Sequence, residues 1–169
     1  VTFHTMHMGD LVVRKKSDLL ELDFPTDTLH KCDLPRMVQE SLGKEPAECF
    51  MGRSDFLLIF ASEAEVLALR PDFRKLALAD GRGIIVTAPG SDVDFVSRFF
   101  APSIGVAEDP VTGSAHCCLG PYWGEKLKKT TLVGFQCSAR GGLVHVTLNG
   151  DRVILGGHSV HIFSGKILV

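Results

Sequence analysis

The segment best suited to chemistry is a loop with two carboxylates, followed by the start of a long predicted helix. The loop contains Glu108 and Asp109, and a Thr-Gly-Ser turn at residues 112–114 leads into the helix. The first backbone N–H groups of a helix have no partner inside it, and the helix dipole makes this end attractive to anions. Gly113 has no side chain to crowd a ligand that approaches this backbone. We therefore expect a carboxylate to bind at the start of the helix, with Asp109 beside it.

An acidic side chain next to a bound carboxylate suits proton transfer. Removing a proton from the carbon beside a carboxylate creates negative charge, which the N–H groups of a helix terminus can stabilise. A carboxyl group such as that of Asp109 can move the proton. The alternative is that Ser114 is an ordinary N-cap and Asp109 an ordinary turn residue, because capped helices are common. The residues alone leave both interpretations open.

Other polar side chains near this helix are weaker candidates. His116 falls in the first turn, where the dipole disfavours its charged form, and either local packing or a substrate contact would explain it. Cys117 is a candidate for an activated thiol near the helix N-terminus, whereas Cys118 belongs to the apolar face of the helix. The Arg140-Gly141-Gly142 segment either brings a guanidinium to a carboxylate or is a plain turn between strands.

Metals, nucleic acids and membranes are not expected partners. His4 with His7, and His158 with His161, are three residues apart in predicted strands, so the members of each pair point to opposite faces and do not grip one ion easily. The net charge of −2 gives no basic footprint for nucleic acid. No apolar run approaches the length of a membrane span. Five cysteines without CxxC spacing favour reduced thiols in the cytoplasm.

A strand-rich framework must position the loop and its helix. Alternation and turn residues predict strands over 1–8, 11–15, 19–24, 47–53, 56–61, 83–88, 94–101, 131–138, 143–148, 152–155 and 160–169. Helices are predicted over 34–42, 63–69, 72–78 and 115–128. Ser62 with Glu65 predicts a capping box, and Asn149-Gly150 predicts a type I′ hairpin. Many antiparallel strands with a few helices predict an α+β fold.

The second half of the chain resembles a known family. The strings Asp94–Pro102 and Glu108–His116, continued by Pro121-Tyr122-Trp123 and by residues 136–142, are similar to the signature of the phenazine-biosynthesis-like (PhzF-type) isomerases. The resemblance extends over nearly the whole chain and is strongest from 83 to 157. It implies a diaminopimelate-epimerase-like fold. In such a fold two similar lobes each roll a sheet around a central helix, and the active site lies between them.

The resemblance also implies an activity and a set of residues. Members of the family act on small carboxylic acids by proton transfer, use no metal or organic cofactor and are commonly homodimers. By position, Asp109 and Ser114 match the catalytic aspartate and serine. Gly113 and the backbone of Ser114 match the cradle for the substrate carboxylate, and Thr112 and His116 are further candidates for substrate binding. The family's principal base is a glutamate in an early Ser-Glu-Thr-like motif, and a Gly-His-Ala-Thr-like motif completes the site. Neither motif occurs in this sequence.

The resemblance implies a division of the chain as well. Residues 30–159 correspond to a complete C-terminal lobe, and residues 1–29 and 160–169 to remnants of an N-terminal lobe that is otherwise missing. We therefore expect an isomerase whose main base lies outside this sequence. One alternative is a non-catalytic protein that binds small molecules or other proteins and keeps the anion pocket. Another is a cysteine-dependent epimerase of the diaminopimelate type, which Asp109-Pro110 disfavours because a thiol is expected there.

Overall fold

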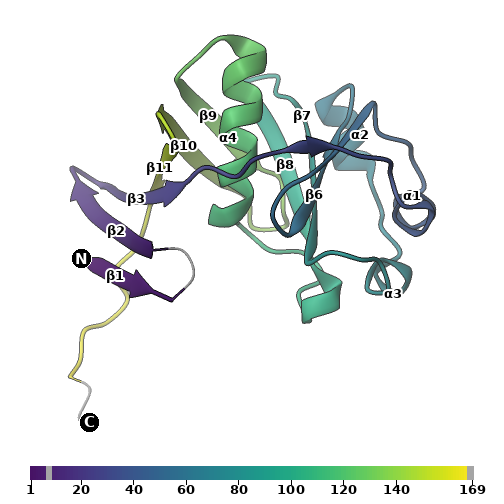
Figure 1. Ribbon diagram of the computed structural model, residues 1–169. Coiled ribbons are helices and arrows are strands. Elements are labelled where there is room, and N and C mark those ends of the chain that lie inside the picture. Colours follow the sequence, from purple (N-terminus) through teal and green to yellow (C-terminus); the bar gives the residue numbers. More distant parts are fainter. Residues whose placement is uncertain (7–8, 167–169) are drawn as a thin grey trace.

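The computed structural model describes residues 1–6 and 9–166, which form eleven strands and four α-helices (Figure 1). The strands are β1 (Thr2–Thr5), β2 (Gly9–Lys16), β3 (Leu19–Pro25), β4 (His30–Lys31), β5 (Glu48–Met51), β6 (Asp55–Ile59), β7 (Gly83–Pro89), β8 (Phe95–Phe100), β9 (Thr131–Gln136), β10 (Gly142–Asn149) and β11 (Arg152–His158). The helices are α1 (Arg36–Leu42), α2 (Glu63–Ala68), α3 (Phe73–Leu76) and α4 (Gly113–Leu127), with a 3₁₀ turn at Pro102–Ile104. The prediction of an α+β fold is confirmed.

All strands belong to one mixed sheet, in the order β1-β2-β3-β11-β10-β9-β8-β7-β6-β5-β4. β6 pairs with β7 and β8 pairs with β9 in parallel, while the other neighbours are antiparallel. Parallel neighbours need a crossover connection. Helices α2 and α3 make the first crossover, and α4 makes the second. The candidate loop at residues 101–112 therefore follows a parallel strand and enters the crossover helix.

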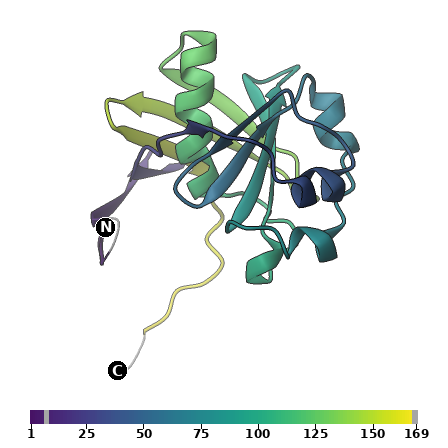
Figure 2. The ribbon, with the colours of Figure 1, turned by 45° about the vertical axis from the view of Figure 1, so that its right-hand side comes forward.

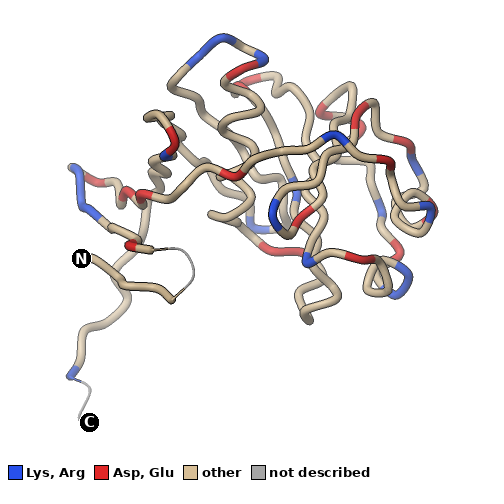
Figure 3. Tube along the Cα trace, in the orientation of Figure 1, with Lys and Arg blue, Asp and Glu red and all other residues tan. Residues whose placement is uncertain are grey.

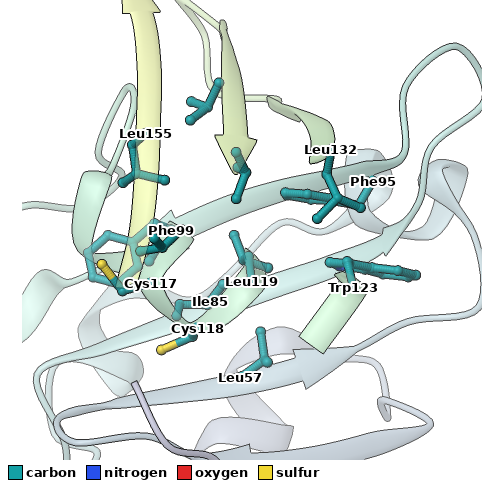
Figure 4. Close-up of a cluster of buried hydrophobic side chains, with 14 of the residues drawn as sticks. Leu57, Ile85, Phe95, Phe99, Cys117, Cys118, Leu119, Trp123, Leu132 and Leu155 are labelled. Carbon is teal, nitrogen blue, oxygen red and sulfur yellow. The ribbon is translucent and has the colours of Figure 1, made fainter. Parts of the chain in front are cut away.

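The central strands are buried on both faces, so alternate residues enter two different cores. This is the pattern expected of a sheet that helices cover on both sides. On one face α4 packs against the sheet, and Figure 4 shows this cluster, which includes Leu57, Ile85, Phe95, Phe99, Cys118, Leu119, Trp123, Leu132 and Leu155. The cluster on the other face includes Val38, Leu42, Phe56, Leu58, Phe60, Val66, Leu76, Ile84, Val86, Val96 and Phe100.

Close contact with the sheet fixes the position of α4. A Cβ atom on Gly124 would lie 2.4 Å from Cδ1 of Leu148, and one on Gly120 would lie 2.8 Å from Cγ1 of Val146. Both glycines thus let the helix approach β10 more closely than a larger residue would allow. The Trp123 ring stacks on Phe95 with centroids 5.9 Å apart, and its Nε1 donates a hydrogen bond of 3.0 Å to the Thr87 hydroxyl. The packing therefore holds the C-terminal half of α4 in a defined place against the sheet.

Several predicted boundaries need correction. Helix α4 begins at Gly113 rather than at residue 115, and α1 begins at Arg36 rather than at 34. The hairpin loop is Gly150-Asp151, and only Gly150 has a positive φ, of 61°, whereas a type I′ turn needs two such residues. The Ser62 N-cap is confirmed, although the Glu65 carboxylate accepts from the N–H of Ala61, one residue before the cap.

The two ends of the chain differ most from the sequence prediction. Gly9 and Asp10, which separate the predicted strands over 1–8 and 11–15, form the start of β2 instead. Residues 159–166 form no strand, because they pair with no strand of the described sheet, and the predicted strand over 160–169 is therefore wrong for its described part. Residues 7–8 and 167–169, where parts of two predicted strands fall, lie outside the described residues. Figures 1 and 2 both show the β1–β2 hairpin and the segment after β11 extending away from the helices.

The predicted division at residues 29 and 30 runs through a continuous sheet. β3 pairs with β11 along its whole length, from Pro25 opposite Arg152 to Leu19 opposite His158. The Arg152 guanidinium also donates to the Asp23 carboxylate at 2.7 Å. Assigning residues 1–29 and 160–169 to a separate lobe stays a prediction.

Charged groups of both signs are interspersed along the chain (Figure 3). Lys126, Lys128 and Lys129 lie around the C-terminal end of α4, where positive charge suits the helix dipole. In the part of the chain that the structure describes, no helix is long and apolar enough to cross a membrane. The same residues contain no group of three His, Cys, Asp or Glu side chains that could hold a metal ion.

Candidate active site

The start of α4 is organised by a hydrogen-bond network around Thr112, its N-cap residue. The Thr112 hydroxyl donates to the Asp109 carboxylate and caps no N–H group of the helix. Gln136, at the end of β9, is fully buried. Its Oε1 accepts from the Thr112 N–H at 2.8 Å, and its Nε2 donates to the Asp109 carbonyl at 2.7 Å. Gln136 thus ties the loop after β8 to the neighbouring parallel strand.

Asp109 is therefore held by its backbone, while its carboxylate lies at the start of the helix. The Asp109 N–H donates to the Phe99 carbonyl at 3.0 Å, which fastens the loop to the end of β8. The side chain is half-buried and receives the Thr112 hydroxyl. The structure thus brings together Asp109 and Thr112, two of the predicted site residues.

The other carboxylate of the loop has a structural role. Arg98 donates from Nε and Nη2 to the two oxygens of Glu108, at 2.8 and 3.0 Å. Its Nη1 donates to the carbonyls of Val66 and Leu69, and its guanidinium lies 4.8 Å from the centre of the Phe100 ring. Glu108 therefore fixes the loop to α2, and Asp109 is the carboxylate left at the helix.

His116 lies inside the core, with none of its surface exposed. Its Nδ1 lies 2.8 Å from the Thr112 carbonyl, an acceptor, so Nδ1 must carry the hydrogen. Burial lowers the pKa of His116 to about 4, and the ring is neutral at pH 7. Its Nε2 is buried without a hydrogen-bond partner in the described part of the chain. His116 contacts the N-cap residue Thr112 through this bond, and its direct contact with substrate stays a prediction.

Ser114 is an exposed residue in the first turn of α4, two positions after the N-cap. The interpretation of Ser114 as the N-cap is therefore wrong. Its hydroxyl accepts a hydrogen bond of 2.9 Å from Nη2 of Arg82, a residue that precedes β7. Sequence reasoning did not find Arg82, because nothing local links it to a residue 32 positions later in the chain.

Two cavities flank the first turn of α4. On the Gly113 side is a cavity of about 640 Å³. Its lining is Leu22, Phe24, Val111, Gly113, Arg140, Gly141, Gly142, Leu143, Val144, Leu155, Gly156, Gly157 and His158. On the Ser114 side is a smaller one of about 270 Å³. Its lining is Pro25, Thr26, Asp27, Arg53, Ser54, Asp55, Arg82, Ser114 and Cys117. Neighbouring helix residues open onto different cavities because they are about 100° apart around the axis.

The Arg140-Gly141-Gly142 segment is a turn and also lines the cavity on the Gly113 side. Gly141 has a φ of 71°, and its N–H donates to the Ser138 hydroxyl at 3.0 Å. That hydroxyl donates to the Pro110 carbonyl at 2.7 Å, which links the turn to the candidate loop. The interpretation of this segment as a turn is confirmed, and a contact between Arg140 and a carboxylate stays a prediction.

The two adjacent cysteines are not activated. Burial raises the pKa of Cys117 to about 12, and nearby Asp27 adds to the effect. Burial and the Asp27 carboxylate also raise the pKa of Cys118, whose Sγ donates to that carboxylate at 3.4 Å. The thiolate is the nucleophilic form of cysteine. The structure therefore does not support the candidate role of Cys117 as an activated thiol.

Comparisons with known proteins identify the family of the chain. The family described as "Phenazine biosynthesis-like protein" matches residues 10–165. An "uncharacterized isomerase" of Pseudomonas aeruginosa is 46% identical over 159 residues, which are 94% of this chain and 61% of the relative. Another, of Halalkalibacterium halodurans, is 42% identical over 172 residues and is covered to 64% of its length. The chain thus spans about three-fifths of the length of these curated relatives.

A solved structure has a similar fold. A phenazine biosynthesis protein of the PhzF family from Enterococcus faecalis superposes with a TM-score of 0.87 at 41% sequence identity. The superposition covers 94% of this chain and 60% of that chain. The fold, the family match and these relatives agree, and the chain belongs to the phenazine biosynthesis-like family of PhzF-type isomerases.

Proposed function

We propose that the protein containing this chain moves a proton on a small carboxylic acid, and that this chain binds the carboxylate and supplies Asp109. The observation that carries the proposal is the start of α4. The Thr112 hydroxyl, which would normally cap the helix, is held by Asp109 instead. The exposed first turn therefore offers backbone N–H groups at Gly113 and Ser114 beside a carboxylate.

In the proposed reaction the substrate carboxylate accepts hydrogen bonds from the Gly113 and Ser114 N–H groups and from the Ser114 hydroxyl. A base outside this sequence removes a proton from carbon, and the electron pair of that C–H bond is delocalised toward the bound carboxylate. The N–H groups and the helix dipole stabilise this charge. Asp109 assists or delivers a proton to another carbon, where a new C–H bond forms. One C–H bond breaks and one forms, so the step balances without an oxidant, a metal or an organic cofactor.

The assembly of the whole protein is also part of the proposal. Residues 30–159 would form one diaminopimelate-epimerase-like lobe, and residues 1–29 and 160–169 would join a second lobe, with the site between them. The greater length of the curated relatives supports a second lobe. We propose that the whole protein is a homodimer of the cytoplasm.

Solvent-isotope exchange tests the function. The full-length protein is incubated in D₂O with a panel of small carboxylic acids that carry a C–H beside the carboxylate or conjugated to it. Mass spectrometry then detects deuterium incorporation. We expect at least one acid to exchange, and we expect Asp109→Asn to slow that exchange by about a hundredfold or more. Asp92→Asn, which changes an exposed carboxylate in another loop, is the matched control.

The outcomes separate the alternatives. Full exchange by Asp109→Asn would remove Asp109 from the mechanism. An acid that binds by calorimetry but never exchanges would favour the non-catalytic binding protein. A panel that neither binds nor exchanges would contradict the proposed function as a whole.

A further inference from the structure

Arg82 contacts the candidate site from a separate part of the fold. It lies just before β7, and its Nη2 donates to the Ser114 hydroxyl at 2.9 Å. Arginine has no acceptor atom, so Ser114 must be the acceptor in this bond. The one hydrogen of the Ser114 hydroxyl then remains to be donated, and the described residues provide no acceptor for it. The Arg82 contact thus fixes Ser114 as a donor on the exposed surface of the first turn.

The guanidinium of Arg82 is held on several sides. Its Nε donates to Oδ1 of Asp55 at 2.9 Å and its Nη2 to the other carboxylate oxygen, and the Asp55 side chain is only 6% exposed. The Arg82 N–H donates to the Ser54 carbonyl at 2.8 Å. The guanidinium also lies 5.6 Å from the centre of the Phe99 ring. A two-pronged pairing of this kind fixes direction as well as distance.

Gly83 makes room for this arrangement. The parallel pairing of β6 and β7 places Asp55 opposite Gly83. A Cβ atom on Gly83 would lie 2.4 Å from Cζ of Phe99 and 3.1 Å from Oδ1 of Asp55. Any side chain here would displace two of the groups that hold Arg82. The parallel pairing of the two strands and the absence of a side chain on Gly83 thus both help to hold the Arg82 guanidinium in place.

We propose that Arg82, held by the buried carboxylate of Asp55, is a positioning residue that fixes the Ser114 hydroxyl as a hydrogen-bond donor to the bound substrate carboxylate. This inference rests on the proposed function, because it assumes that a carboxylate binds at the first turn of α4. An isolated ion pair between Arg82 and Asp55 would hold the fold together equally well without affecting a ligand. The two roles differ in their effect on ligand binding: only a positioning role makes the contribution of Ser114 to binding depend on Arg82.

A double-mutant cycle on carboxylate binding tests the dependence. The probes are benzoate, whose carbon next to the carboxylate is planar as it is after proton removal, and any acid that exchanges in the preceding experiment. Calorimetry measures Kd for the full-length protein and for Ser114→Ala, Arg82→Met and the double variant. We expect each single change to weaken binding about tenfold, the effect of a hydrogen bond to a charged group. The double variant should bind no more weakly than the weaker single variant.

Two further variants separate positioning from folding. Arg82→Lys keeps one hydrogen-bond donor but loses the paired donors of the guanidinium. It should therefore bind the probes more tightly than Arg82→Met and more weakly than the unaltered protein. Asp94→Asn is the matched control for Asp55→Asn. The Asp94 side chain is only 15% exposed and also forms an ion pair, with Lys129 at 2.6 Å, but at the opposite end of α4. Both variants should lower the melting temperature, whereas only Asp55→Asn should weaken binding of the probes.

The result also separates failure of this inference from failure of the proposed function. If Ser114→Ala weakens binding while Arg82→Met does not, or if the two effects multiply, the role of Arg82 is wrong and the proposed function stands. If the unaltered protein binds no probe and exchanges no acid, both fail together. If Arg74→Met, an exposed substitution on α3, weakens binding as much as Arg82→Met, the effect is one of general charge and the positioning role is overturned.

Discussion

The two sides of the first turn of α4 are built in different ways, although they begin at neighbouring residues. On the Gly113 side the cavity is lined mainly by apolar side chains and by five glycines, together with Arg140 and His158. A Cβ atom on Gly157 would meet nothing within 4 Å. On the Ser114 side the cavity is less than half as large and is lined by two aspartates and two arginines. The space on the Gly113 side exists largely because glycines have no side chains, whereas the Ser114 side is lined by side chains of opposite charge.

This difference teaches how one helix turn can recognise two properties of a ligand. Under the proposed function, the spacious side accommodates the body of the acid, while the charged side orients the hydroxyl that binds its carboxylate. The hydrogen-bond network of Thr112, Asp109 and Gln136 holds the start of α4, whose first turn reaches both cavities. Substitutions in this shared centre should therefore affect both sides, whereas substitutions in one wall should affect only one.

The largest effect is expected from Gln136→Leu. This change leaves the buried Thr112 N–H and the Asp109 carbonyl without their partner, and each unpaired buried group costs about 1–3 kcal/mol. We expect the free energy of unfolding to fall by about 4 kcal/mol, measured by urea denaturation. Gln39→Leu on α1 is the matched control and should change little. An equal loss in both variants would mean that Gln136 does not hold the centre.

The next largest effect concerns His116 and pH. Its pKa is about 4 in the folded protein and 6.5 in the unfolded chain, so between these values the unfolded chain binds more protons. The free energy of unfolding should therefore fall as the pH is lowered from about 7 to about 4, by on the order of 3 kcal/mol in total. Urea denaturation at several pH values should show a smaller slope for His116→Asn. The exposed substitution His30→Asn should keep the slope, and an unchanged slope in His116→Asn would contradict the assignment.

A smaller effect should appear on the Gly113 side alone. Gly157→Leu places a side chain in open space without backbone strain, since Gly157 has no positive φ. We expect KM for an exchanging acid with a large body to rise about tenfold, while the smallest acid keeps its KM. Gly165→Leu, also in open space, is the control. Equal effects on large and small acids would show that the cavity does not receive the body of the substrate.

The smallest effect is expected at the thiols. Cys117 lines the charged cavity, but its pKa of about 12 leaves little thiolate at neutral pH. Iodoacetamide should therefore leave the exchange rate of the native protein unchanged, and Cys117→Ala should behave in the same way. Loss of turnover that follows alkylation of Cys117 would restore the cysteine-dependent mechanism.

Local patterns predicted most of the secondary structure. The strand near residues 84–88 follows from its apolar Ile84-Ile85-Val86 core, as expected of a strand buried on both faces. The apolar face of α4 follows from helical periodicity. The start of α4 was predicted two residues late. Its usual signal, a hydroxyl on the N-cap, is present in Thr112, but that hydroxyl bonds to Asp109. The predicted strand after residue 159 failed because alternation reports a propensity, whereas a strand also needs a neighbour to pair with.

The candidate site was only partly predictable. Asp109, Thr112, Gly113 and Ser114 are close in sequence and could be recognised together. Gln136 lies within the family signature, but nothing in the sequence shows that it reaches back 24 residues to Thr112. Arg82 is visible only once β6 and β7 are paired. The candidate binding residues lie together in one sequence motif, whereas the residues that hold them in place lie far away in the sequence and become neighbours only in the folded sheet.

The parallel pairing of β8 with β9 has a consequence for the order in which the chain folds. A ribosome completes the loop that carries Asp109 and Thr112 well before it reaches Gln136, and α4 lies between them. The loop can close on Gln136 only after the crossover has formed and β9 has joined the sheet. Closing such a distant contact comes late because the entropy of the intervening chain must first be lost. The Thr112 amide should therefore gain protection from hydrogen exchange together with β9. The site should reach its final geometry only after the core beneath it has formed.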